Sequence, residues 1–489
     1  MYNPAIWLLA ALAAPCGLLA VRYWQHALFA VFVLMVFEGA LRKWVLPSAQ
    51  VQIYLIKDVI LLAAYLGFLL DSRIKKLSSP KGVSLIRIVL IVAFVYGCME
   101  IFNPNSPSIL VGLAGLKTYF LYPPVAFILP YAIKSRQHFL GLIRRYLIMA
   151  IPVAVLGFVQ IIAGPASFLN VYVSWTEDAP AILSYFGSNF EFVRTSGTFS
   201  YISGYTAYLT FMGFLAIGYN MANGWRLKKN IIPLAALTLI VGAMFTTGSR
   251  SPVFILLLTG PVILWLAAIS RVLPAQTAMR LCILIPILGI VAMNISPQAF
   301  EAFMARTNAS DSSETLYRFY SPLWQTSGVL VDAPPLGLGI GTTLPSAIAI
   351  MGVDWPWWIK DELMTEDESA RVTVELGLIG LLLIYFLRVV IIVFALRCAR
   401  SFRDPAYRAI GISLAVYLAM ALVIPVILSP TAGLYYWGTL GLVLTMQRLE
   451  QTAIGRVPVR PVVNGRVQTG IPNKIGQTDD YPWPKRLPR

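Results

Sequence analysis

Long apolar runs recur along most of the chain, from Ile6 to Met446, and they constrain the fold more than any other feature. Each run is long enough to cross the hydrocarbon core of a bilayer as a helix, which takes about 20 residues. Hydrophobic residues make up 58% of the chain and charged residues only 12%, about half the charged share of a soluble domain. We therefore predict an all-α, polytopic integral membrane protein rather than a soluble enzyme.

The apolar runs divide into about thirteen predicted transmembrane helices. We place the loop that contains Arg73 and Lys81 in the cytoplasm, because Lys and Arg gather on that side of membrane proteins. Alternation then puts the N-terminus outside and the C-terminus inside. The predicted spans are residues 6–21, 27–41, 53–70, 84–99, 117–133, 146–163, 201–219, 231–247, 251–269, 281–296, 372–396, 409–428 and 431–447.

The distribution of charge supports this topology. Of the 38 Lys and Arg residues, 27 fall on the predicted cytoplasmic side, together with only five of the 22 Asp and Glu residues. The formal charge of +16 therefore follows from the positive-inside pattern. No basic soluble domain is present in the pattern to bind nucleic acid, so no nucleic-acid partner is expected.

Two regions stand apart from this regular alternation. Residues 1–447 form the predicted transmembrane domain, which carries two long outer loops at residues 164–200 and 297–371. A loop of that second length is too long for a plain connector and often carries function, so we expect chemistry on the outer face. Residues 448–489 are rich in Pro, Gly and Arg, and we predict a disordered basic tail near anionic lipid.

Seven cations lie on the outer side or at the outer ends of spans, against the prevailing charge bias. A cation at such a depth is costly unless it is paired or hydrated, so a functional role is the first hypothesis for each. Several arginines facing one cavity would suit a phosphate or diphosphate, which arginine binds in bidentate fashion. The alternative for each is an ion pair with an outer acid. The seven are Arg42, Lys43, Lys117, Arg194, Arg250, Arg318 and Arg371.

Three of these arginines lie in distinctive local sequences. Arg194 opens the stretch Arg-Thr-Ser-Gly-Thr-Phe-Ser at 194–200, directly before the seventh span, and Arg250 lies in a tight turn between spans eight and nine. Arg318 falls on the polar face of a predicted interfacial helix, residues 312–330. The glycine-rich residues 337–341 lack the strand and helix of a phosphate loop, so we expect a turn that brings backbone close to another segment or to substrate.

Acidic residues gather before the eleventh span. On a continuous helix Glu368 shares a side with Arg371, whereas Glu366 points roughly opposite. A carboxylate beside an arginine could act as a general base on a hydroxyl group. The alternative is an acidic cluster that favours the helix dipole.

Other chemistries have little support in the residues. The two histidines, His26 and His138, both fall on the predicted cytoplasmic side, so we expect no metal, no cofactor and no Ser-His catalysis outside. Lys57 and Asp58 are neighbours inside the third span. We expect them to form a local pair at its outer end, with a proton relay as the alternative.

Over roughly residues 30–445 the chain resembles the bacterial O-antigen ligase/polymerase superfamily of membrane glycosyltransferases. The resemblance lies in the order of several short motifs and in the late outer loop. These motifs are Gly112-Leu-Ala-Gly-Leu-Lys-Thr-Tyr-Phe-Leu-Tyr122, the stretch 194–200, the Ser249-Arg250 turn, Arg318, the stretch 337–341, and Glu375-Leu-Gly-Leu-Ile-Gly380.

The resemblance implies an inverting, metal-independent glycosyltransferase of the C-type in a bacterial inner membrane, with an undecaprenyl-diphosphate-linked glycan as donor on the periplasmic face. Arg194, Arg250 and Arg318 would bind the diphosphate, supported by Lys117 and Arg42. The outer loop would position the acceptor, and a chain-length regulator is an expected partner.

One departure from the family pattern bears on the reaction. Ligases carry a histidine at the position of Glu366, so the base could be Glu366 or Glu368, beside Arg371. The missing histidine favours a polymerase of O-antigen, capsule or exopolysaccharide repeats over a ligase that transfers glycan to lipid A-core. A lipid-linked glycan transporter or flippase is the alternative from another class, and it would be built from paired broken helices and internal repeats.

Overall fold

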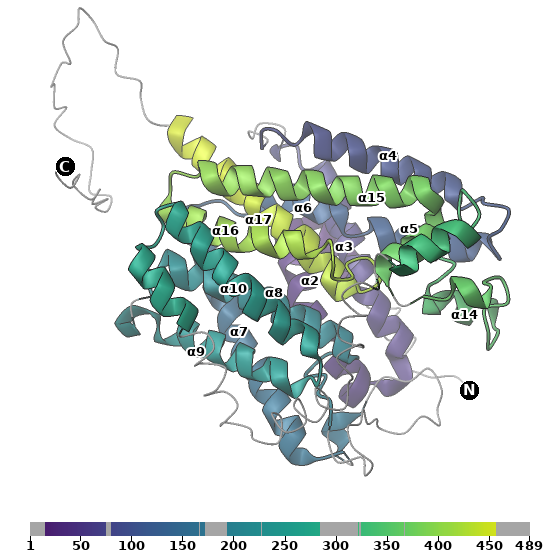
Figure 1. Ribbon diagram of the computed structural model, residues 1–489, viewed down its shortest axis with the longest axis horizontal. Helices are drawn as coiled ribbons and strands as arrows, with labels where there is room; N and C mark the ends of the chain where they lie inside the picture. The colour runs from purple at the N-terminus through teal and green to yellow at the C-terminus, as the bar shows by residue number, and fades with distance from the viewer. Residues whose placement is uncertain are drawn as a thin grey trace, which may run out of the picture.

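The computed structural model describes residues 15–74, 80–165, 167–171, 193–225, 227–283, 321, 324–365 and 367–455. Within these ranges every regular element is a helix and no strand occurs. Figure 1 shows long helices packed side by side in one bundle. The main helices are α2 (Trp24–Ala40), α3 (Gln50–Leu70), α4 (Ser84–Glu100), α5 (Ile109–Phe120), α6 (Pro123–Ala132), α7 (Arg136–Ala163), α8 (Ile202–Ala222), α9 (Leu227–Thr246), α10 (Arg250–Ile269), α14 (Pro345–Met351), α15 (Glu368–Ser401), α16 (Pro405–Met420) and α17 (Pro430–Gly455).

The fold agrees with a helical membrane protein but leaves the number of spans open. Helices lie at eleven of the thirteen predicted spans, and the other two, 6–21 and 281–296, fall largely outside the described residues. By length and composition, four described helices can cross a membrane, or five if the bent pair α5 and α6 counts as one. The helical membrane class is confirmed, whereas the count of thirteen is not.

Two predicted spans run through places where the helices end, and a proline lies at or just beyond each of these places. The span predicted at 117–133 is two helices, α5 and α6, that meet at 40°. The bend falls just before Pro123 and Pro124, whose rings cannot continue a helix. The span predicted to end at 428 stops at Met420, and Pro425 lies in the non-helical segment 421–428 that follows. The backbone amides freed in that segment become part of the site described below.

The first residues of the predicted disordered tail are helical. Helix α17 continues to Gly455, and Arg448 is buried with its guanidinium donating to the carbonyl of Ile133 at 3.0 Å. Residues 448–455 therefore belong to the helical bundle, because this arginine packs against the chain that follows α6 rather than in water. The remainder of the predicted tail, 456–489, lies outside the described residues.

Side-chain contacts show which loops lie at the same end of the helical bundle. Arg136 pairs with Asp404 at 2.5 Å, and Gln447 donates to the carbonyl of Lys81 at 3.1 Å. Arg136, Asp404 and Lys81 belong to predicted cytoplasmic loops, and Gln447 ends the predicted span 431–447 on that side. At the other end Arg42 donates to Ser200, joining two predicted outer loops. This sorting is what helices alternating between two faces would produce.

Candidate functional site

The stretch 193–200, which we call the outer segment, connects two groups of cations. Its first half lies against the turn between α9 and α10. The Arg194 guanidinium donates to the carbonyl of Thr247 at 3.1 Å and to the hydroxyl of Ser249 at 2.7 Å. Arg250 begins α10 next to this hydroxyl, with Ser249 as the N-cap. Arg194 thus contacts the serine directly before Arg250, although the sequence separates the two arginines by 56 positions.

A glycine in the turn between α9 and α10 lets the Arg194 side chain come this close. Gly248 has φ +60°, and an added Cβ would lie 2.7 Å from the Arg194 side chain. A glycine here adopts the left-handed backbone conformation and leaves room for the Arg194 side chain. These contacts with Thr247 and Ser249 fix the orientation of the Arg194 guanidinium.

The second half of the outer segment lies against α2 and the π-helical turn Leu41–Val45 that follows it. Gly39 admits the backbone of 198–200, since a Cβ there would lie 2.2 Å from the Ser200 nitrogen. Arg42 donates to the Ser200 hydroxyl at 3.0 Å. Lys43 donates to the Ser196 hydroxyl and the Gly197 carbonyl, both at 2.9 Å. Arg42 and Lys43 therefore both donate to the segment of eight residues that contains Arg194.

Lys43 differs from the others in its electrostatics. It lies in the turn between α2 and α3 with only 5% of its surface exposed. Burial lowers the pKa of Lys43 to about 7, because the charged ammonium has lost most of its hydration. The pKa of Lys43 therefore lies near neutrality, so this lysine responds to pH in that range.

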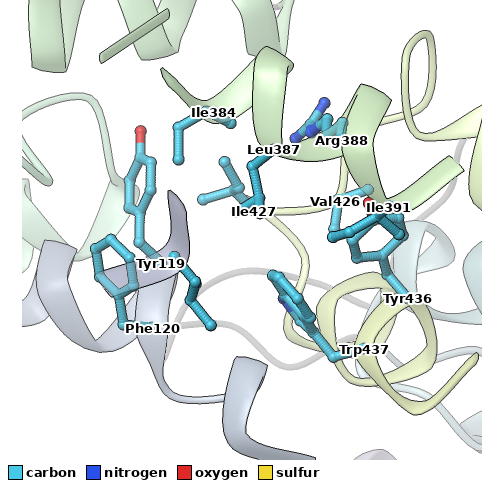
Figure 2. A pocket seen from close by; sticks show the side chains of 11 residues that line it. Tyr119, Phe120, Ile384, Leu387, Arg388, Ile391, Val426, Ile427, Tyr436 and Trp437 are labelled. Carbon is cyan, nitrogen blue, oxygen red and sulfur yellow. The ribbon is translucent and has the colours of Figure 1, made fainter. Parts of the chain in front are cut away.

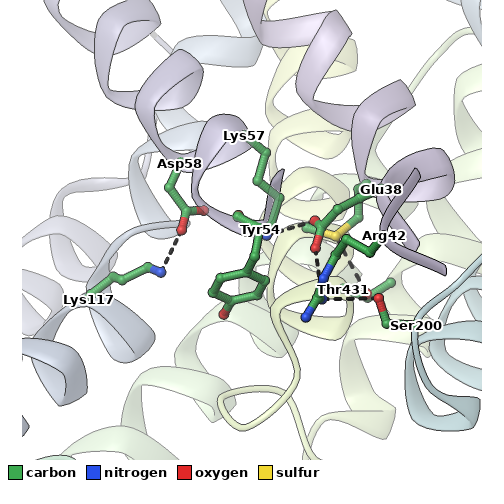
Figure 3. Close-up of polar contacts among 9 residues, drawn as sticks. Glu38, Arg42, Tyr54, Lys57, Asp58, Lys117, Ser200 and Thr431 are labelled. Atoms are coloured by element: carbon green, nitrogen blue, oxygen red, sulfur yellow. Dashed lines mark hydrogen bonds and ion pairs between the residues drawn. The ribbon is translucent and has the colours of Figure 1, made fainter. Parts of the chain in front are cut away.

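Beyond Arg42, a network of charges extends into α3 and α5 around the ring of Tyr54 (Figure 3). Glu38 pairs with Lys57 at 2.7 Å and with Arg42 at 3.3 Å, and Asp58 pairs with Lys117 at 2.5 Å. The ring of Tyr54 lies 3.7 Å from the Lys57 ammonium and 4.7 Å from that of Lys117. Cation–π contacts of this kind stabilise charge away from water.

The network corrects one prediction and favours an alternative for two others. Lys57 and Asp58 do not pair with each other, because adjacent residues on a helix point about 100° apart and each meets a partner on a different helix. Arg42 and Lys117 form the ion pairs with acids that we gave as the alternative to ligand binding. The side chain of Lys117 keeps 33% of its surface exposed, so only this pair opens towards solvent or lipid.

The glycine-rich stretch 337–341 packs against protein backbone. Leu338 and Gly339 donate their amides to the carbonyls of Val374 and Glu375 in α15, at 2.7 and 3.0 Å. At the far end, a Cβ on Gly341 would lie 2.6 Å from Gly115 in α5. Of the two options that we gave, contact with another segment is the one observed, since these amides bond to α15.

Glu375 completes this packed unit. It is fully buried and accepts hydrogen bonds from the Tyr119 hydroxyl at 2.8 Å and from the amide of Thr343 at 3.0 Å. Three of the motifs that carry the family resemblance, 112–122, 337–341 and 375–380, are therefore in mutual contact. These three motifs, which are far apart in the sequence, therefore form one packed structural unit.

Glu368 occupies a different environment from that predicted for a general base. Its side chain forms a buried ion pair with Arg388, and it accepts from the backbone amides of Val426, Ile427 and Leu428 at 2.7, 2.6 and 3.3 Å. Both oxygens are engaged by donors. These contacts favour a structural role, in which Glu368 joins α15 to segment 421–428.

The pairing of Glu368 with Arg388 requires that α15 be broken. In a straight helix these residues would lie about 30 Å apart, far beyond side-chain reach. Gly377 supplies the break with φ +63° and ψ −167°, and a Cβ there would lie 2.1 Å from the Pro335 carbonyl oxygen. Only glycine can hold this conformation at such a close approach.

The surroundings of Arg388 leave little room for substrate. Figure 2 shows the cavity beside it, lined mostly by apolar side chains from α5, α15 and α17. Its volume of about 30 Å³ would hold one or two waters and no sugar. The Glu368–Arg388 pair is therefore a clamp in the bundle core.

Of the remaining predicted site residues, the structure describes Arg371. Arg371 donates through Nε to the carbonyl of Thr365 at 2.8 Å, which braces the turn before α15. Glu366 and Arg318 lie outside the described residues. Of the predicted interfacial helix, residues 324–330 are helical.

Sequence reasoning missed Arg388 and Tyr54. A charge in the middle of an apolar span was the available signal for Arg388, since such residues are costly unless partnered. No signal in the sequence indicated that Tyr54 would lie among three cations, because these come from the π-helical turn after α2, from α3 and from α5. Among the described residues, no cluster of three or more His, Cys, Asp and Glu is placed to hold a metal ion.

Comparisons of the chain with family models, with curated proteins and with solved structures find no match.

Proposed function

We propose that this protein is a metal-independent inverting membrane glycosyltransferase. Its substrates would be undecaprenyl-diphosphate-linked repeat units, which it would join into O-antigen, capsule or exopolysaccharide on the periplasmic face of the inner membrane. The observation that carries the proposal is the placement of Arg194 and Lys43 along the outer segment, with Arg250 directly after the serine that Arg194 contacts.

The chemistry of such a group suits a diphosphate leaving group. As the glycosidic bond to the donor breaks, negative charge develops on the diphosphate, and oriented cations stabilise that charge most in the transition state. Arg194 donates to the turn 247–249, so the orientation of its guanidinium is set before substrate binds. This fixed orientation is the feature that a leaving-group site needs.

The contacts of Glu368 bear on which of the two predicted carboxylates acts as the general base. Glu368 is engaged by Arg388 and by backbone amides, so Glu366 is the remaining carboxylate of the predicted pair. We propose Glu366 as the base for the acceptor hydroxyl.

A lipid-linked glycan transporter is the second candidate, and two features favour it. Transporters use broken helices near the substrate site, and the chain has breaks between α5 and α6 and at Gly377. The charges Glu38, Lys57 and Asp58 lie within or beside membrane-crossing helices, as expected of a proton pathway.

An assay of glycan length distinguishes these functions. Purified full-length protein in nanodiscs is incubated with an undecaprenyl-diphosphate oligosaccharide, and products are followed by gel. A polymerase yields a ladder that is lost in Arg194→Ala and kept in Arg73→Ala, a matched control whose side chain is 84% exposed at the other end. Transfer only on addition of lipid A-core would identify a ligase. Movement of lipid across vesicles without bond formation would identify a transporter and refute the enzyme.

A further inference from the structure

A second, larger cavity lies far from the outer segment and is lined almost wholly by apolar side chains. It has a volume of about 240 Å³ and lies between α2, α6, α7, α8 and α17. Phe32, Leu129 and Phe211 are among the side chains that form its wall, and Gly438 leaves space for it on α17. A cavity of this size and chemistry fits part of a hydrocarbon chain.

One charged group stands at this cavity. Among the described residues that line it, Arg145 alone is charged, and Leu142, Tyr146 and Met149 follow the same face of α7. His138 lies two turns before Arg145 on that face, contacts the ring of Phe29 and lies within electrostatic range of both Arg145 and Lys134. The apolar cavity therefore adjoins a cationic group at its predicted cytoplasmic end.

We propose that this cavity binds one acyl chain of an anionic glycerophospholipid, whose phosphate is bound by Arg145. The complementarity is twofold, because the wall is apolar along the chain and the cation lies where the headgroup of the adjoining leaflet would be. A zwitterionic lipid would bring its own headgroup cation close to the guanidinium, and a soluble anion would leave the apolar wall without its chain.

The site is separate from the proposed diphosphate site. Gln160, fifteen residues after Arg145 on α7, bonds to Gly197 of the outer segment at 2.8 Å. Fifteen residues of helix span about 22 Å, so the two anion sites lie near opposite ends of α7. The lipid proposed here is therefore not the undecaprenyl-linked donor, and its test does not depend on the proposed function.

Adjacent arginines on α7 provide a matched pair for the test. Arg144 and Arg145 are both exposed and lie at the same membrane depth, yet only Arg145 lines the cavity. Full-length protein in nanodiscs of phosphatidylcholine with phosphatidylglycerol is transferred to detergent, and the retained lipid is measured by native mass spectrometry. We expect the wild type and Arg144→Gln to retain phosphatidylglycerol, and Arg145→Gln to retain about tenfold less, the effect of one charge-assisted contact.

Two further arms make the outcome decisive. Leu142→Phe narrows the cavity without touching the charge, and a variant that elutes as a folded protein should also lose the lipid. Equal loss in Arg144→Gln and Arg145→Gln would overturn the proposal in favour of general surface attraction. Displacement of the lipid by inorganic phosphate alone, or by undecaprenyl phosphate at equal concentration, would also overturn it.

Discussion

The buried pair of Glu368 and Arg388 gives a prediction that separates a structural clamp from a catalytic base. Glu368→Gln keeps the shape of the side chain and an oxygen for the amides of segment 421–428, but it leaves the Arg388 charge buried without its partner. Arg388 is 4% exposed, so it cannot recover hydration by moving to the surface. Breaking a buried ion pair in this way costs about 3–5 kcal/mol.

The double variant Glu368→Gln/Arg388→Met should recover much of this loss. Methionine fills the space of the arginine stem and removes the uncompensated charge, so the double variant should be no less stable than either single variant. Unfolding by titration with sodium dodecyl sulfate in mixed micelles measures each free energy. Additive losses, or a wild-type midpoint for Glu368→Gln, would refute the clamp.

The folded double variant then tests the chemistry. If Glu368 only joins α15 to segment 421–428, the variant should keep glycan transfer within a few fold of wild type. A general base contributes about 10²–10⁴ in rate. A loss of that size in a stable double variant would restore Glu368 as the base.

Three further predictions follow from other positions. Gly377→Ala should abolish accumulation of monodisperse protein on size-exclusion chromatography, because its Cβ would overlap the Pro335 carbonyl at a positive φ; Gly328→Ala, with open space around it, is the control and should be normal. Since the unfolded Lys43 has a pKa of about 10.4 and burial lowers it to about 7 in the fold, the unfolded state binds more protons between these values. Stability should therefore rise with pH across that window, and this rise should be smaller in Lys43→Met, measured as unfolding midpoints at pH 7 and 9; equal slopes in both proteins would contradict it. In a background without the four native cysteines, Arg73→Cys should react with an impermeant maleimide only from the cytoplasmic side and Tyr201→Cys only from the periplasmic side, and the reverse pattern would invert the topology.

The sequence predicts helices well here because period and hydropathy are local properties. Helices α3, α4 and α10 begin and end within a few residues of the predicted spans. The bend before Pro123 and the early end of α16 before Pro425 were also signalled by proline, yet hydropathy alone runs through both. The break at Gly377 has no comparable local signal, because it depends on contact with Pro335.

The site was less predictable for a related reason. The sequence identifies the cations that need a partner at the ends of spans. Their partners, however, come from other helices, and spacing along the sequence does not show which helices pack together. Arg194 meets the turn at 247–249, whereas Glu368 meets an arginine twenty residues later through a break in its own helix. The sequence indicates which residues need partners, and only the packing shows whether that partner is another side chain or a ligand.

The central proposal is that the cations along the outer segment bind a diphosphate. The affinity of the purified full-length protein for undecaprenyl diphosphate in nanodiscs, compared with undecaprenyl monophosphate, tests this most directly. We expect tighter binding of the diphosphate, weakened about tenfold or more in Arg194→Ala and unchanged in Arg73→Ala, since loss of a charged bidentate donor removes more than 1 kcal/mol. Equal affinity for both lipids, or equal binding by both variants, would contradict the proposal.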